Sequence, residues 1–211
     1  MAKNAKIATR PMRAVRPADL DGLYVNPRAV LAKQAKAGKV HKVAHGVYVA
    51  VPDDAYDPKR WRPALEAAAG AVGTAMFGDR RVALMGLSAA RLHRVVPRAR
   101  ARADVAIGRR HAPVRLADRD HGVVNFVRRD LDDLDVQPIR TELGTILVTT
   151  PEQTLVDLAL GRAADTADVR EAMRGLARKA DWPRVEKIAA HRRGGKRALA
   201  TLRVLHGEAK A

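Results

Sequence analysis

The sequence predicts an α+β fold in which a small N-terminal unit precedes a mixed α/β domain that ends in a helical segment. Near residue 40 the spacing of apolar residues changes from a helical period to strict alternation. Short apolar runs bounded by turn residues recur between residues 81 and 148, and capped helical patterns follow up to residue 205. At 211 residues the chain is long enough for two small domains that share an interface.

The N-terminal quarter is predicted to contain an arm and one compact unit. Residues 1–16 form a basic arm, since Pro11 interrupts any helix that might run through them. The unit covers residues 17–52 and starts with a short helix over residues 17–23, which Gly22 ends.

A second helix is predicted over residues 26–37 of the same unit. Asn26 is a good N-cap, Pro27 suits the first helical position, and Gly38 lies where a helix ends in a left-handed residue. From Val40 onward the apolar period is two, which predicts a hairpin with His45-Gly46 at its tip.

An acidic segment without periodicity, residues 52–57, is predicted to mark the boundary to a second domain that covers residues 58–211. The segment TTPEQTLVDLALG carries a cap, a Pro, a capping-box-like Gln153 and a terminal Gly, which together predict a helix from Thr150 to Gly161. The other helices are expected at 57–77, 88–95, 166–179, 182–192 and 196–205, and the strands at 81–85, 104–107, 123–128, 137–143 and 145–148.

Charge and composition bound the possible partners. Lys and Arg number 40 against 23 Asp and Glu, a net charge of +17 that points to a polyanion. The excess is densest in residues 1–49, which hold ten basic and two acidic residues. The absence of cysteine excludes disulfides and thiolate metal sites. No apolar leader or bilayer-length apolar run is visible, so a cytoplasmic protein without a membrane partner is expected.

The helix predicted over residues 26–37 is amphipathic in an unusual way. On a helical wheel, Arg28, Lys33 and Lys36 share one flank with small alanines, while Val30 and Leu31 lie on the opposite side. Small side chains between cations let a helix approach the floor of a DNA major groove. A merely solvated face is the alternative, but such faces normally mix signs, and no acidic residue occurs between Gly22 and Val51.

A short helix, a second helix and a basic hairpin follow one another in the order of a winged helix-turn-helix domain. In that arrangement Arg28 would contact guanine, Lys33 and Lys36 would touch phosphate, and the hairpin would clamp the flanking phosphates. The candidate DNA-binding residues are therefore Arg13, Arg16, Asn26, Arg28, Lys33, Lys36, Lys39, Lys42 and His45. Such domains commonly bind inverted repeats, so the chain is expected to bind double-stranded DNA as two copies.

Several enzyme and metal sites are disfavoured by spacing, so no catalytic residue and no cofactor is expected. Ser88 and His93 lack the Gly-x-Ser-x-Gly of a nucleophile elbow, and Ser88 is expected to be a helix N-cap. His41 and His45 have no nearby carboxylate in the sequence, so no metal site is expected. Glu142 and the acidic loop around Asp132 lack the pattern of a nuclease.

Two further features leave alternatives open. The run HRRGGKRA, residues 191–198, has too few glycines for a phosphate-binding loop and is interpreted as a helix break or as a secondary anion site. RNA binding is disfavoured because seven aromatic residues in the chain form no stacking platform.

Three segments, AHGVYVAV, MGLSAARLH and TTPEQTLVDLAL, together resemble the AbiEi family of antitoxins from type IV toxin–antitoxin systems. The likeness spans roughly residues 17 to 160. The matching residues are Gly46, Val47, Tyr48, Gly86, Ser88, Ala89, Ala90, His93, Thr154, Asp157 and Leu158. His45 stands where that family more often has Arg, which implies a weaker or pH-sensitive hairpin contact.

The resemblance implies a bifunctional protein. Its N-terminal winged helix would repress its own operon, and its C-terminal domain, residues 58–211, would counteract a co-transcribed nucleotidyltransferase-like toxin, directly or indirectly. The residues that carry this neutralising activity are not evident from the sequence. A basic adaptor for an acidic protein partner and, less well supported, a diverged nuclease are the alternatives.

Overall fold

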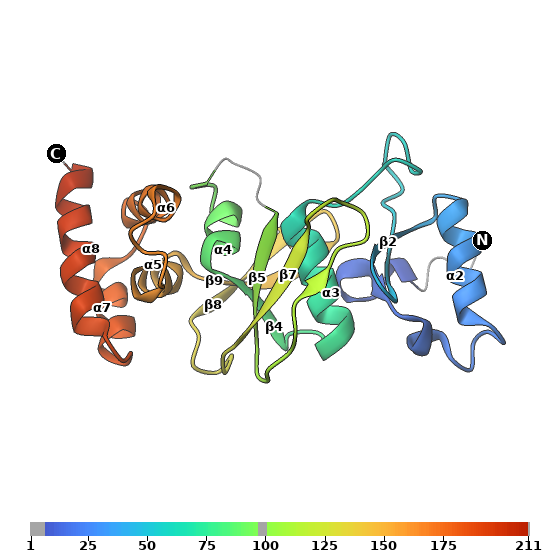
Figure 1. Cartoon of the computed structure of the whole chain (residues 1–211), viewed down its shortest axis with the longest axis horizontal. Helices are drawn as coiled ribbons and strands as arrows, with labels where there is room; N and C mark the ends of the chain where they lie inside the picture. The colour runs from blue at the N-terminus through green and yellow to red at the C-terminus, as the bar shows by residue number, and fades with distance from the viewer. Residues whose placement is uncertain (1–6, 97–100, 211) are drawn as a thin grey trace.

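The computed structural model describes residues 7–96 and 101–210, and it confirms the α+β class. Its elements lie along one long axis, with α2 near one end, a central sheet, and the C-terminal helices at the other end (Figure 1). In the described part of the chain the strands form a three-stranded and a six-stranded sheet. No helix in the described ranges is both long enough and apolar enough to cross a bilayer.

The N-terminal sheet is antiparallel, with the order β1-β3-β2. Its strands are β1 (Ala14–Val15), β2 (Val40–Ala44) and β3 (Val47–Ala50). Because side chains alternate along a strand, one face packs on the 3₁₀ helix η2 (Pro17–Leu20) and on α2 (Pro27–Lys36), around Leu31. The other face packs on α3 (Leu65–Phe77), so the sheet has a hydrophobic core on both sides.

The larger sheet has the strand order β6-β7-β5-β4-β9-β8 and mixes parallel and antiparallel pairs. The strands are β4 (Val82–Met85), β5 (Arg102–Ile107), β6 (Val114–Arg115), β7 (Val123–Arg128), β8 (Val136–Thr141) and β9 (Gly144–Thr149). Val82 and Leu84 point toward the core that α3 shares, whereas Ala83 and Met85 pack with Leu134 of the β7–β8 connection. Strand β4 is therefore buried on both faces, as its unbroken apolar run predicts.

The C-terminal helices form a second core. They are α5 (Pro151–Leu160), α6 (Ala167–Ala177), α7 (Trp182–Ala190) and α8 (Gly195–Lys210), and α4 (Gly86–Leu92) joins them to the sheet. The cap predicted for α5 is confirmed, because Thr150 accepts a hydrogen bond from Gln153 N. The side chain of Gln153 does not complete a capping box; its Oε1 accepts from Asp135 N instead.

Two element boundaries differ from the prediction for a clear reason. The helix expected from residue 57 begins at Leu65, because Asp57 forms a local turn with Lys59 and Arg60 and Pro63 breaks the helical pattern. Glu142, from the β8–β9 turn, accepts a hydrogen bond from Ala64 N at 2.6 Å and so fixes the residue that precedes α3. The two-residue strands β1 and β6 were not predicted, since such short segments carry no periodic signal.

The N-terminal segment and the predicted second domain are in close contact, and residues 1–6 of the predicted arm lie outside the described residues. Residues 7–16 are folded into the molecule: Ile7 and Met12 are each 2 % exposed, and β1 pairs with β3. The core of α3 continues into Met12, Val43 and Val49 of the N-terminal unit. The irregular segment 52–57 connects the units, but removing residues 1–57 would expose one face of α3.

Candidate nucleic-acid interface

The cationic flank of α2 is open to solvent. The helix begins after Asn26, whose Oδ1 accepts from Ala29 N at 3.1 Å, as predicted. Leu31 is fully buried against the N-terminal sheet, while Arg28, Lys33 and Lys36 are exposed. The same hydrophobic anchor therefore fixes both the position of the helix and the outward direction of its cations.

A groove of about 510 Å³ separates the start of α2 from the β2–β3 hairpin. It brings together four of the predicted residues, Arg16, Arg28, Lys42 and His45, beside Tyr48. Arg16 precedes η2 and Arg28 belongs to α2, whereas Lys42 and His45 both come from the β2–β3 hairpin. This clustering of basic groups gives the groove a positive potential suited to an anion.

Lys33, Lys36 and Lys39 lie outside this groove. Lys33 and Lys36 occupy the last turn of α2, and Lys39 follows Gly38, whose φ of +70° turns the chain into β2. All three are exposed. Cations in the last turn also favour the helix by interacting with its dipole, so their presence has a structural explanation as well.

Arg13 is placed differently from the expectation. Its guanidinium donates to the carbonyl oxygens of Ala50 and Val51 at 3.2 and 3.3 Å, which ties the 3₁₀ helix η1 (Pro11–Arg13) to the end of β3. An arginine committed to two backbone carbonyls is a structural residue. Arg16 remains at the groove, with Asp19 Oδ1 3.9 Å from its Nη2.

The outer edge of the hairpin is fixed to the rest of the molecule. Ala117 N donates to Val43 O at 2.9 Å, and a bridge joins Ala44 to Leu116. These contacts cover the edge of β2 that would otherwise be unpaired. The hairpin is consequently attached to residues 116–117, and its tip at His45-Gly46 lines the groove.

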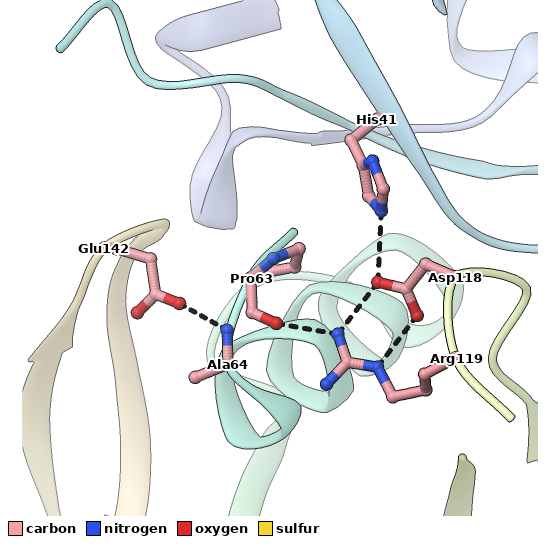
Figure 2. A network of polar contacts seen from close by, with 6 residues as sticks. All are labelled: His41, Pro63, Ala64, Asp118, Arg119 and Glu142. Atoms are coloured by element: carbon pink, nitrogen blue, oxygen red, sulfur yellow. Dashed lines mark hydrogen bonds and ion pairs between the residues drawn. The ribbon is translucent and has the colours of Figure 1, made fainter. Parts of the chain in front are cut away.

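A buried polar network strengthens this attachment (Figure 2). His41 Nε2, on β2, lies 3.1 Å from Asp118 Oδ2, and Arg119 donates to both oxygens of the same carboxylate. Arg119 also donates to Pro63 O at 2.7 Å, next to the start of α3. Burial raises the pKa of Asp118, but the hydrogen bonds from Arg119 and His41 outweigh it and lower the pKa to about 2.

The network was missed at the sequence level because its members are far apart along the chain. His41 and Asp118 are separated by 77 residues. No carboxylate is near His41 along the sequence, but the fold brings the carboxylate of Asp118 beside it. No group of three or more His, Cys, Asp or Glu side chains suited to a metal ion occurs among the residues that the structure describes.

Ser88 and His93 have structural roles in the described fold. Ser88 is not the N-cap of α4; it lies inside the helix, and its Oγ accepts from Asp104 N at 3.0 Å. His93 follows the helix, and its Nε2 lies 2.7 Å from Thr149 O. Burial lowers the pKa of His93 despite this hydrogen bond.

Comparisons with known proteins define the fold alone. The sequence matches no protein-family profile and no curated protein. The structure is similar to the crystal structure of the RV2827C protein from Mycobacterium tuberculosis, with a TM-score of 0.56 and 18 % sequence identity. The match covers 98 % of this chain and 75 % of that protein. The chain therefore shares its overall architecture with a solved mycobacterial protein.

Proposed function

We propose that this protein binds double-stranded operator DNA through α2 and the β2–β3 hairpin, and that it is an autorepressing antitoxin of the kind its sequence resembles. The observation that carries the proposal is the uncovered cationic flank of α2, at one end of the molecule and free of acidic neighbours on its own helix. We assign no catalytic step to the chain. Its proposed partners in the cytoplasm are operator DNA and a nucleotidyltransferase-like toxin.

The order of elements supports a winged helix. Strand β1, helices η2 and α2, and then β2 and β3 follow in sequence, and the three strands pair around a core on which both helices pack. In such domains the second helix of the pair enters the major groove while the hairpin lies along the backbone. Helix α2 would be the recognition helix and the hairpin would be the wing.

The dimensions of α2 are compatible with this role. The helix has 10 residues, and at a rise of about 1.5 Å per residue it is about 15 Å long. Ala29 and Ala32 lie on the exposed flank, so the backbone can come close to the base edges. Arg28 at the start of α2 also lines the groove, where Lys42 is positioned to meet a neighbouring phosphate.

Gel-shift titrations at two salt concentrations test this assignment, with DNA from upstream of the gene and random DNA of equal length. Arg28→Ala should weaken cognate binding by about 1 to 3 kcal/mol and reduce discrimination between the two DNAs. Lys42→Ala should weaken both DNAs alike and lower the salt slope by about 0.9, because one phosphate contact is lost. Lys196→Ala, an exposed lysine on α8, is the control that removes the same charge elsewhere.

Equal effects of Arg28→Ala on cognate and random DNA would show that Arg28 does not read bases. Equal effects of Lys42→Ala and Lys196→Ala would remove the hairpin contact, and no binding of either DNA at low salt would favour an acidic protein as partner. Sedimentation of the chain on an inverted-repeat operator measures whether two copies bind.

The antitoxin role is tested with the full chain, since residues 58–211 share a core with the N-terminal unit. Co-expression with the neighbouring toxin gene should restore growth, both for the natural chain and for a variant with Arg28, Lys33 and Lys36 changed to Ala. Restored growth in both cases would separate neutralisation from DNA binding. Persistent growth arrest with the natural chain would refute the antitoxin role.

A further inference from the structure

A second charged cleft shares no lining residue with the groove beside α2. It has a volume of about 880 Å³ and lies between the β7–β8 connection, α5 and the end of α7. The cleft is wide enough for a small organic ligand, since ligand pockets usually measure a few hundred to about 1,000 Å³. Its lining includes Arg129, Gln153, His191 and Arg192.

Two guanidinium groups at this cleft share one carboxylate. Arg129 Nη1 and Arg192 Nη1 lie 3.2 and 3.5 Å from the same oxygen, Oδ1 of Asp157. The side chain of Asp157 is 4 % exposed, so the three charges meet away from bulk water. Burial and the neighbouring Arg129 lower the pKa of Arg192, which reflects the cost of placing a second cation there. The cluster carries one positive charge more than its carboxylate neutralises.

Unused hydrogen-bond donors accompany this excess charge. Gln153 is 1 % exposed, and its Oε1 accepts from Asp135 N at 3.3 Å, which directs its amide nitrogen elsewhere. Within the described ranges, Gln153 Nε2, Arg129 Nη2 and Asp157 Oδ2 all lack a hydrogen-bond partner. Asp157 Oδ2 is an acceptor on the carboxylate that Arg129 Nη1 already contacts, so it is available to Arg129. Buried donors in proteins are nearly always paired, so the unpaired amide of Gln153 favours a ligand with acceptors.

The acidic side chains of the cleft offset this preference only in part. Asp135 is already engaged: Arg184 Nη2 lies 2.6 Å from its Oδ1, and Thr150 Oγ1 donates to its Oδ2 at 3.0 Å. Asp132 and Asp133 are exposed at the rim, where they could accept from hydroxyl or amino groups of a ligand. Asp133 lies near enough to Arg192 to act against the lowering of its pKa, so the exposed carboxylates partly offset the cationic groups of the cleft.

We propose that this cleft is a binding site for a small molecule that bears a phosphate group, held by Arg129, Arg192 and the amide of Gln153. Arginine is well suited to this task because its planar guanidinium donates two parallel hydrogen bonds to phosphate oxygens. The sequence left two interpretations for residues 191–198, a helix break or an anion site. In the structure the segment ends α7, and it also contributes His191 and Arg192 to the cleft. The site is independent of DNA binding by α2.

Isothermal titration calorimetry on the full chain tests the site with three probes at matched ionic strength: inorganic phosphate, ATP and adenosine. Phosphate and ATP should bind, whereas adenosine, which lacks phosphate, should not. Tighter binding of ATP than of phosphate would indicate that the rim contacts the rest of a nucleotide, and equal binding would indicate a site for phosphate alone; both results support the proposal.

Paired variants locate the binding. Arg192→Gln should weaken phosphate and ATP by about tenfold or more, since a charged hydrogen-bonding partner is lost. Arg193→Gln, which removes the same charge from the adjacent exposed residue outside the cleft, should leave both within about twofold. Arg28→Ala should also leave both unchanged, which separates this cleft from the groove beside α2.

Gln153→Glu provides a second test if Arg192→Gln does not fold, because it keeps an acceptor for Asp135 N and replaces the free amide donor by an acceptor. Unfolding curves without ligand establish that each variant is folded. Equal weakening by Arg192→Gln and Arg193→Gln, or no binding of phosphate and ATP up to about 10 mM, would overturn the proposal. The cluster would then be a structural ion-pair network only.

Discussion

Replacing Asp118 by Asn tests how strongly the buried network attaches β2 to the rest of the molecule. The change preserves the shape of the side chain but removes the negative charge that Arg119 and His41 contact. The folded state lowers the pKa of this carboxyl from 3.8 to about 2. Since one pKa unit corresponds to about 1.4 kcal/mol, the charged form contributes about 2 kcal/mol to the free energy of unfolding.

The sign of the pH dependence follows from the direction of this shift. A carboxyl with a lower pKa in the folded state contributes its full stabilisation above pH 4, and it loses that stabilisation as the pH falls toward 2. We therefore expect Asp118→Asn to lower the free energy of unfolding by about 2 kcal/mol at pH 7 and by about 1 kcal/mol at pH 3. At neutral pH the unfolding temperature should fall by about 4 to 8 °C.

Urea unfolding followed by circular dichroism, at pH 7 and pH 3, measures both differences. Asp120→Asn is the matched control, because Asp120 is exposed and lies two residues along the same segment. It should change the free energy of unfolding by less than about 0.5 kcal/mol at either pH. A loss for Asp118→Asn that is the same at both pH values, or no larger than that of the control, would refute the electrostatic account of the network.

Three further substitutions test other parts of the fold. Leu31→Ala should lower the free energy of unfolding by about 2 to 5 kcal/mol, because it opens a cavity under α2. An almost unchanged midpoint of urea unfolding would contradict this. Gly38→Ala should cost about 1 kcal/mol, since φ is +70° and an added Cβ would lie 3.3 Å from the Pro58 backbone; an unchanged unfolding temperature would contradict this. Arg91→Met should destabilise by about 3 kcal/mol or more, because Glu66, 3 % exposed, would lose the ion pair that Arg91 Nε makes at 2.9 Å. A loss below about 1 kcal/mol in urea unfolding would argue against this account.

Local rules were sufficient for the elements whose signals lie within a few residues. The Asn26 cap, the Gly38 turn and the spacing of Arg28, Lys33 and Lys36 correctly predicted a helix that buries Leu31 and exposes its cations. The reason is that caps and helical faces depend on hydrogen bonds and side-chain directions within one or two turns. The same rules failed at residues 57–64, where Glu142 from a distant turn holds Ala64, the residue before the next helix.

The roles of the remaining site residues were decided by contacts between distant segments. Whether Arg13 reaches DNA depends on the carbonyls of Ala50 and Val51, which only the pairing of β1 with β3 brings beside it. The partner of His41 is likewise fixed by the way residues 116–119 dock on β2.

The sequence by itself determined the helices, the alternating strands and a cationic flank on α2, because each rests on neighbours along the chain. The tertiary structure alone decided which charges are free and which are used. Arg13 donates to backbone carbonyls, and Asp118 is paired with Arg119 and His41. Arg129 and Arg192 both contact the carboxylate of Asp157 beside an open cleft. The physical reason is that the environment of a charge is set by which segments pack around it, and the packing of segments tens of residues apart leaves no periodic trace in the sequence.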